Sequence, residues 1–183
     1  MSLPDTDDLA RIEAAVWQEL GQAVRVKGHP WRYAVMATAD GAQADARLVV
    51  LREFDESARE LMVFTDARSP KVQQLAAQAH AMLVLWHPGL GWQLRLDAQV
   101  QVETAGLAVS SRWARLKMTP AAHDYLSPLP PGSAVERPLP ERGTREHFAI
   151  LKARITHADW LALGPEGQRR AGFDAEGRRW LVP

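Results

Sequence analysis

Two arginines stand in a short apolar segment, residues 46–52, whose composition is typical of a β-strand. Because side chains alternate along a strand, Arg47 and Arg52 point to opposite faces. Both faces are otherwise apolar, with Val49 and Leu51 beside Arg47 and with Leu48 and Val50 beside Arg52. A guanidinium on such a face needs a partner, because its unpaired charge is costly to bury. That partner is either a carboxylate of this chain or the anionic group of a ligand, and the pattern leaves both open.

A second basic site follows a short apolar strand predicted at residues 61–65. Ser69 and Pro70 are typical of the first positions of a helix, and Lys71 comes directly after them. A helix start offers backbone amides without partners, and the hydroxyl and the ammonium beside them would suit a phosphate. An exposed helix start with a solvated lysine is the plainer interpretation of the same residues.

The clearest pattern in the chain is a strict alternation of apolar and polar residues over residues 92–103. It predicts a long, half-buried strand with Gln93 and Arg95 on the polar face. If this face lines a cleft, Gln93 can both donate and accept hydrogen bonds, and Arg95 supplies a fixed positive charge. Otherwise both side chains face solvent.

Several kinds of catalytic site are excluded or disfavoured by residue type. The chain has no cysteine, which excludes disulfides, thiol nucleophiles and zinc–thiolate sites. No two of the six histidines stand at a helical metal-binding spacing with a carboxylate, so we expect no catalytic metal. The Gly-x-Ser-x-Gly motif of hydrolases and the glycine-rich phosphate loops are also missing.

Length and charge narrow the class of protein further. The chain has 183 residues, and we expect one domain over residues 1–183. Its 22 basic and 22 acidic residues cancel, so we expect no nucleic-acid partner, because such binders carry a basic excess. No apolar run approaches the roughly 18 residues of a membrane span, and the acidic start is unlike a signal peptide. We therefore expect a cytoplasmic protein with no membrane contact.

The elements that would position these residues form an α+β pattern. An N-terminal helix is predicted within residues 1–27, capped by Asp5 or Thr6. Strands are predicted at residues 31–38, 46–52, 61–65, 81–86, 92–103, 147–155 and 180–182, with residues 81–86 buried on both faces. Helices are predicted at residues 69–79, 107–118 and 158–163, and residues 128–143 form a proline-rich loop. Many strands and few helices favour a curved antiparallel sheet or barrel with peripheral helices.

The order of these features resembles the FMN-binding split-barrel proteins of the pyridoxamine 5′-phosphate oxidase family. The resemblance runs from about Trp31 to the end of the chain. It is carried by the segments RLVVLR at 47–52, FT at 64–65, SPK at 69–71, WQLRL at 92–96, HFAIL at 147–151, ADWLAL at 158–163 and RWLVP at 179–183.

This resemblance implies an FMN-dependent oxidoreductase, an antiparallel split β-barrel that forms a homodimer with FMN at the interface and acts on a small molecule. Arg47 and Lys71 would hold the FMN phosphate with the help of Ser69. The residues expected near the flavin ring are Leu48, Val49, Val50, Leu51, Phe64 and Thr65. Gln93 would reach the polar edge of the ring, and Arg95 is a further candidate for binding the cofactor.

The substrate side departs from the family pattern. The oxidases of this family bind the substrate phosphate with a lysine, a tyrosine, an arginine and a serine, and the counterparts here are Arg52, Trp113, Lys117 and Ala121. The first three are our candidate substrate residues, and we expect the vitamin phosphates themselves to be poor substrates. The alternatives are a non-catalytic flavin- or haem-binding split barrel and an interaction module without a cofactor.

Overall fold

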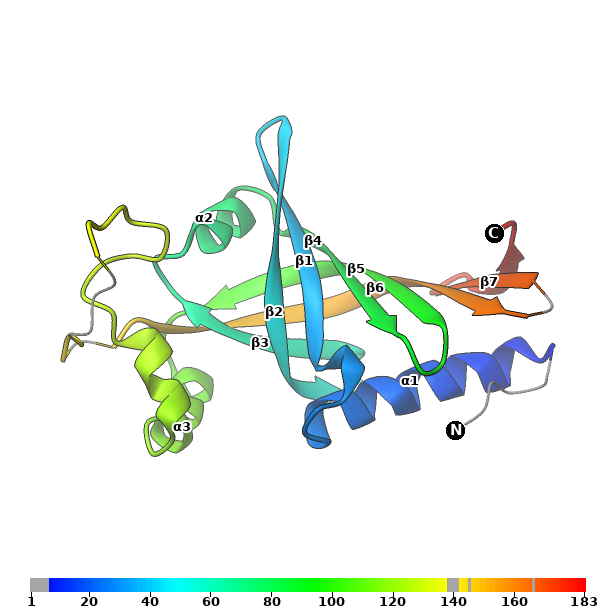
Figure 1. The fold of residues 1–183 in the computed structure, drawn as a ribbon, viewed down its shortest axis with the longest axis horizontal. Coiled ribbons are helices and arrows are strands. Elements are labelled where there is room, and N and C mark those ends of the chain that lie inside the picture. Colours follow the sequence, from blue (N-terminus) through cyan, green and yellow to red (C-terminus); the bar gives the residue numbers. More distant parts are fainter. Residues whose placement is uncertain (1–6, 138–141, 145, 166) are drawn as a thin grey trace.

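The computed structural model describes residues 7–137, 142–144, 146–165 and 167–183 (Figure 1). Eight antiparallel strands form one sheet in the order β3-β2-β1-β4-β5-β6-β7-β8, and β3 also pairs with β6. The elements are α1 (Leu9–Arg25), η1 (Pro30–Arg32), β1 (Tyr33–Asp40), β2 (Gln43–Asp55), β3 (Glu60–Asp66), α2 (Pro70–Ala77), β4 (His80–His87), β5 (Trp92–Glu103), α3 (Leu107–Leu116), η2 (Pro120–Tyr125), β6 (Phe148–Gly164), β7 (Gly167–Asp174) and β8 (Gly177–Leu181).

The pairing of β3 with β6 closes part of the sheet into a barrel, and β7 and β8 extend the sheet beyond it. The length of β6 makes both possible, because residues 148–154 pair with β3 and residues 157–164 pair with β7. A register shift between Asp97 and Ala98 of β5 lies where β6 passes from one partner to the other. The predicted α+β split barrel with peripheral helices is confirmed.

The split lies between β2 and β3. These strands pair at Leu51 and at residues 53–55 of β2, and β3 then continues along β6 as far as Asp66. Residues 48–50 of β2 pair with β1 but have no pairing with β3 in the described part of the chain. Because successive residues of a strand direct their N–H and C=O groups to opposite sides, part of this backbone faces the split.

Helix α1 covers the barrel with an apolar stripe that includes Ile12, Val16 and Leu20, all fully buried. It is also held by a buried carboxylate: Glu13 accepts hydrogen bonds from Arg59 Nη2 at 2.7 Å and Arg178 Nε at 2.6 Å.

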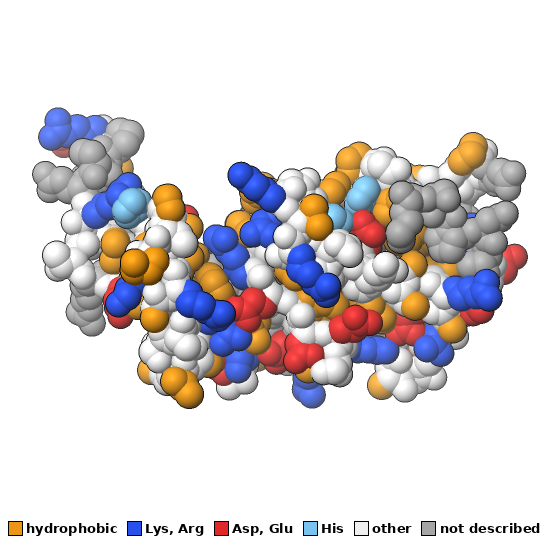
Figure 2. Space-filling view, turned by 90° about the horizontal axis from the view of Figure 1, so that it is seen from below, with side chains coloured by type: hydrophobic (Ala, Val, Ile, Leu, Met, Phe, Trp, Pro, Cys, Tyr) orange, Lys and Arg blue, Asp and Glu red, His pale blue; other side chains and the backbone are white. Residues whose placement is uncertain are grey.

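A smaller apolar core lies under α3. The face that carries α1 and α3 is hollowed beside the lobe with α3, and its basic and acidic side chains are interspersed (Figure 2).

Residues 158–163 belong to strand β6, so the helix predicted there was wrong. Ala158, Trp160 and Ala162 are buried on one face of the strand, and both edges of the segment are paired, with β5 and with β7. Alanine and leucine are good helix formers, but intrinsic helix propensity is a small energy, and pairing on two edges overrides it.

Two smaller expectations also need correction. Strand β4 is buried on one face only, because Met82 and Val84 are half-buried and Trp86 is 46% exposed. Helix α1 begins at Leu9 and its N-cap is Asp8, whose carboxylate accepts from the amide of Ala10, whereas Asp5 and Thr6 lie outside the described residues. The described parts of the proline-rich loop, residues 128–137 and 142–143, contain no helix or strand.

Candidate functional site

Arg47 lies at the rim of the barrel, where β2 passes helix α2. Its Nη1 donates to Thr38 Oγ1 at 2.6 Å and to the carbonyl of Met36 at 3.3 Å. Its Nη2 donates to Gln74 Oε1 at 3.0 Å and pairs with the Asp45 carboxylate. The guanidinium is therefore held in one orientation by groups from β1, β2 and α2.

Lys71, in the first turn of α2, lies near the same rim. Its Nζ donates to Thr65 Oγ1 at 3.1 Å and to Ser69 Oγ at 3.2 Å, and both hydroxyl groups belong to buried residues. Burial lowers the pKa of the Lys71 ammonium and the charge of Arg47 lowers it further, while two nearby carboxylates oppose these effects. In the described part of the chain no carboxylate forms an ion pair with Lys71.

These groups fit the phosphate end of FMN. Two cations from different elements, two hydroxyl groups and the start of a helix are a donor set that a phosphate monoester can satisfy. Two like charges kept close together are unfavourable by themselves, so an anion between them would relieve their repulsion. The structure thus brings Thr65, Ser69 and Lys71 into direct contact, with Arg47 near enough for its charge to lower the pKa of Lys71.

Arg47 and Lys71 together are called the cation cluster below. The split between β2 and β3 adjoins this cluster through Thr65. On its β3 side, Phe64 is half-buried and packs edge-on against Phe148, with ring centroids 5.0 Å apart. On its β2 side lies the backbone of residues 48–50, whose side chains alternate as predicted, Val49 being buried and Leu48 69% exposed. A flat ring with donors and acceptors on one edge could hydrogen-bond to this backbone as another strand would.

Gln93 and Arg95 are not brought to the cation cluster within one copy of the chain. They lie on the outer face of β5, and β4 and β1 separate them from β2. At the usual strand spacing this amounts to about 14 Å. Arg95 lies 3.6 Å from the Asp159 carboxylate, which also pairs with Arg170 at 2.7 Å.

An apolar patch covers the sheet face between these two regions. The side chains that face outward there include Tyr33 (56% exposed), Val35 (39%), Leu48 (69%) and Trp86 (46%). The register places Val35 between Leu48 on β2 and Val84 on β4, so the residues form one continuous surface. Contiguous exposed apolar surface of this kind commonly marks an interaction site.

The three candidate substrate residues fall into two places. Trp113 and the exposed Lys117 line a cavity of about 470 Å³ at the start of α3. Arg52 does not line that cavity; its guanidinium lies 5.8 Å from the ring centre of Phe64, and its buried Nε has no hydrogen-bond partner. Burial raises the pKa of the Tyr125 hydroxyl, and the charge and hydrogen bond of Arg52 oppose this.

Sequence reasoning missed the groups that hold Arg47, although local signals existed for two of them. Asp45 precedes Arg47 by two residues on one strand, so both side chains lie on the same face. Gln74 follows Lys71 by three residues, which places them on one face of α2. Thr38 carried no such signal, because only the pairing of β1 with β2 sets it opposite Asp45.

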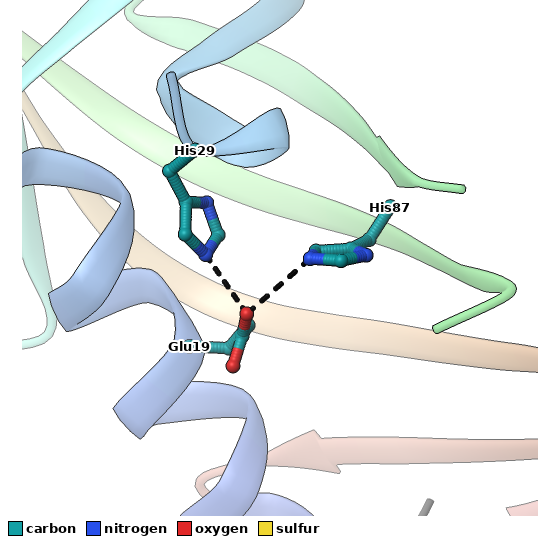
Figure 3. Close-up of side chains that lie close together, drawn as sticks. All are labelled: Glu19, His29 and His87. Atoms are coloured by element: carbon teal, nitrogen blue, oxygen red, sulfur yellow. Dashed lines mark hydrogen bonds and ion pairs between the residues drawn. The ribbon is translucent and has the colours of Figure 1, made fainter. Parts of the chain in front are cut away.

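Sequence reasoning also missed a cluster of Glu19, His29 and His87 (Figure 3). Glu19 Oε1 lies 2.8 Å from His29 Nε2 and 3.5 Å from His87 Nε2. The three residues come from α1, from the residue before η1 and from the end of β4, so no sequence spacing announces them. Their ligand atoms are close enough together to hold a metal ion.

The backbone around this cluster favours hydrogen bonding over metal binding. His29 Nδ1 accepts from the amide of Trp31 at 3.1 Å, and His87 Nδ1 accepts from the amide of Leu90 at 3.0 Å. A neutral imidazole that accepts at Nδ1 carries its proton on Nε2, and that proton points at Glu19. A metal at Nε2 would require the other tautomer. The cluster thus joins α1 to the barrel.

Comparison with known proteins places this chain in a family. Residues 14–104, about half of the chain, match the family model described as pyridoxamine 5′-phosphate oxidase, FMN-binding domain. Through these residues the chain belongs to that family, as the resemblance predicted.

Two curated relatives are both called pyridoxine/pyridoxamine 5′-phosphate oxidase. The protein from Caulobacter vibrioides is 33% identical over 110 residues, which are 58% of this chain and 48% of that protein. The protein from Trichormus variabilis is 42% identical over 65 residues, which are 36% of this chain and 29% of that protein. The matched part thus spans less than half the length of these relatives.

Two solved structures are similar over almost the whole chain. A pyridoxamine 5′-phosphate oxidase-related, FMN-binding protein from Nostoc punctiforme has a TM-score of 0.75 and 22% identity, with 100% of both chains covered. PhzG from Burkholderia lata, solved with tetrahydrophenazine-1-carboxylic acid, has a TM-score of 0.73 and 15% identity, with 99% of this chain and 97% of that chain covered. At these identities the likeness establishes the fold. Among the described residues, no helix is both long and apolar enough to cross a membrane.

Proposed function

We propose that this protein binds FMN and is an FMN-dependent oxidoreductase that acts on a small molecule. The observation that carries the proposal is that Arg47 and Lys71 both lie at helix α2 beside the split. Arg47 Nη2 donates to Gln74 of this helix at 3.0 Å, and Lys71 in its first turn donates to the hydroxyl groups of Ser69 and Thr65. The domain family to which residues 14–104 belong is an FMN-binding one. A cation pair of this kind would hold the phosphate of the cofactor.

The remaining candidate residues would orient the flavin ring. The backbone of residues 48–50 would bind the polar edge of the ring in the split, and Phe64 and Thr65 would border it, whereas Leu51 pairs with Val63 of β3. When bound, FMN supplies the capacity to accept and donate hydride, so the protein needs to bind and orient the reactants and to exclude water. The chain itself need not supply a catalytic acid or base.

We further propose that the protein forms a homodimer through the apolar patch around Val35 and Leu48. A two-fold interface pairs the same surface of both copies. If the axis runs parallel to the strands, it exchanges the two edges of the patch. Gln93 and Arg95 of one copy would then face the split of the other copy and complete its flavin site.

On the substrate side, we propose that Arg52 and Lys117 provide positive charge and that Trp113 provides an aromatic surface. Arg52 forms no ion pair with a carboxylate among the described residues, so its charge, beside the Tyr125 hydroxyl, would attract an anionic substrate. This charge favours a small anionic molecule, and the loss of a tyrosine hydroxyl at Trp113 argues against the vitamin phosphates.

The absorbance spectrum of the purified protein, with the released cofactor identified by mass, tests the proposal. We expect a yellow protein with the flavin bands, which a reductant bleaches and air restores. A haem spectrum, or a flavin that is not reoxidised by oxygen or a nicotinamide, would favour the non-catalytic alternative. Colourless protein that added FMN does not stabilise against heat would favour the interaction module.

A further inference from the structure

A negative charge already lies against the guanidinium of the proposed phosphate site. The Asp45 carboxylate pairs with Arg47 Nη2, and its Oδ2 accepts a hydrogen bond from Gln74 Nε2 at 3.0 Å. The hydrogen bond from Gln74 lowers the pKa of Asp45, and the charge of Arg47 also lowers it while burial opposes both. Asp45 is therefore ionised at neutral pH.

The donor and the acceptor of each surrounding hydrogen bond are fixed. Gln74 Oε1 accepts from Arg47 Nη2 at 3.0 Å and from Thr38 Oγ1 at 2.6 Å, so its Nε2 must face the Asp45 carboxylate. Arg47 Nη1 is engaged by Thr38 and by a backbone carbonyl. Both terminal nitrogens of the guanidinium are thus occupied, and Nη2 is the one held by a charged group.

The charge of Asp45 also reaches the second cation, because it raises the pKa of Lys71 against the opposing effect of Arg47. A carboxylate that pairs with one cation and influences the other does electrostatically what a bound phosphate would do. Protein phosphate sites are built from cations and donors, and an ionised carboxylate within such a site repels the ligand.

The Asp45 carboxylate can move away from Arg47 more easily than Arg47 or Gln74 can move. Its side chain is 44% exposed, against 20% for Arg47, and Gln74 is buried. It stands on the β1–β2 hairpin, which projects from the barrel beside α2 (Figure 1). A change of its side-chain rotamer would carry the carboxylate toward solvent without opening the core.

We propose that Asp45 is an internal competitor of the ligand phosphate, paired with Arg47 in the free protein and displaced when a phosphate monoester binds. It lowers the affinity of the site for FMN and leaves the affinity for riboflavin unchanged, because riboflavin has no phosphate to displace it. The displacement also frees Gln74 Nε2 to donate to the phosphate. The part that concerns FMN rests on the proposed function.

The test compares the dissociation constants of FMN and riboflavin, measured by quenching of flavin fluorescence on the flavin-free chain. Asp45→Asn keeps the shape of the side chain and an acceptor for Gln74 but removes the charge. Loss of one competing ion pair should tighten FMN binding by about tenfold while riboflavin binding stays unchanged. Asp40→Asn is the matched control, because Asp40 is exposed on the same hairpin, and it should change neither constant. Asp45→Ala should act in the same direction.

Inorganic phosphate gives a readout that does not depend on flavin binding. It should raise the melting temperature of Asp45→Asn more than that of the wild type. Equal or weaker FMN binding by Asp45→Asn would overturn the inference and would make Asp45 a residue that positions Arg47. If neither protein binds FMN but phosphate stabilises the variant more strongly, the flavin proposal fails and the competitor role stands. If phosphate also fails to distinguish them, both proposals fail.

Discussion

Lys71 in helix α2 has a lowered pKa, because its ammonium is buried and because the guanidinium of Arg47 on strand β2 lies nearby. The fold therefore brings two positive charges into one neighbourhood, and within the described ranges the close polar partners of the Lys71 ammonium are hydroxyl groups. Like charges held together at an energetic cost are a common mark of an anion-binding site.

Arg47→Ala should weaken FMN binding by about tenfold or more and barely change riboflavin binding. A charged hydrogen bond contributes roughly 1.5–3 kcal/mol, and Arg47 Nη2 can offer one to a phosphate that takes the place of Asp45. Both constants can be measured by fluorescence quenching, with Lys27→Ala as a control that removes an exposed cation elsewhere. Equal losses for the two flavins would mean that Arg47 only supports the fold of the rim.

The affinity for FMN should fall as the pH rises through the lowered pKa of Lys71. The phosphate binds the protonated ammonium, so deprotonation costs affinity, and this should occur below the ordinary lysine value of 10.5. Titration of FMN over a pH series measures the effect. Lys71→Arg, which stays charged, should flatten the profile; an unchanged profile would assign the titration to another group.

The protein should be a dimer in solution, because a monomer would leave the apolar patch around Val35 open to water. Light scattering at micromolar concentration in the presence of FMN measures this directly. Val35→Glu should give a monomer that has lost affinity for FMN. Leu107→Glu, at an 84% exposed position on α3, is the control and should remain dimeric. A wild-type monomer that binds FMN tightly would contradict the shared site.

Pyridoxine 5′-phosphate and pyridoxamine 5′-phosphate should be poor substrates. Trp113 lacks the hydroxyl of the family tyrosine and Ala121 has no side-chain donor, and two lost charged hydrogen bonds lower kcat/KM by at least about a hundredfold. Turnover of each phosphate by the FMN-loaded protein tests this. Formation of pyridoxal phosphate at the rate of a dedicated enzyme would contradict this prediction and would identify the vitamin phosphates as substrates.

Acidification should destabilise the protein through His87. Burial lowers the pKa of His87 below its ordinary value of 6.5, and the charge of Glu19 opposes this. The unfolded chain therefore takes up the proton more readily, and the free energy of unfolding should decrease as the pH falls below about 6.5. Denaturant unfolding between about pH 7 and pH 5 measures the slope.

His87→Gln should reduce that slope, because the residue no longer titrates. The matched control is His80→Gln, on the same strand but 44% exposed at its side chain, which should leave the slope nearly unchanged. If both variants retain the wild-type slope, the acid sensitivity comes from other groups.

The amino-acid sequence by itself determined the elements whose pattern is local. The alternation of residues 92–103 specifies β5 and its two faces, and the period of two assigns Arg47 and Arg52 to opposite faces of β2. The helix start at Ser69 likewise follows from adjacent residues. Such features depend on neighbours along the chain, which is why they can be predicted without a fold.

The tertiary structure alone decided which of these features meet. Residues 158–163 became a strand because β5 and β7 pair with both edges, and Glu19 meets His87 because α1 packs across the end of β4. The partners of Arg47 come from β1 and α2, and the distance of Gln93 from the cation cluster follows from the strand order. These contacts join residues far apart in the chain, and their positions are set by strand pairing and core packing rather than by local preference.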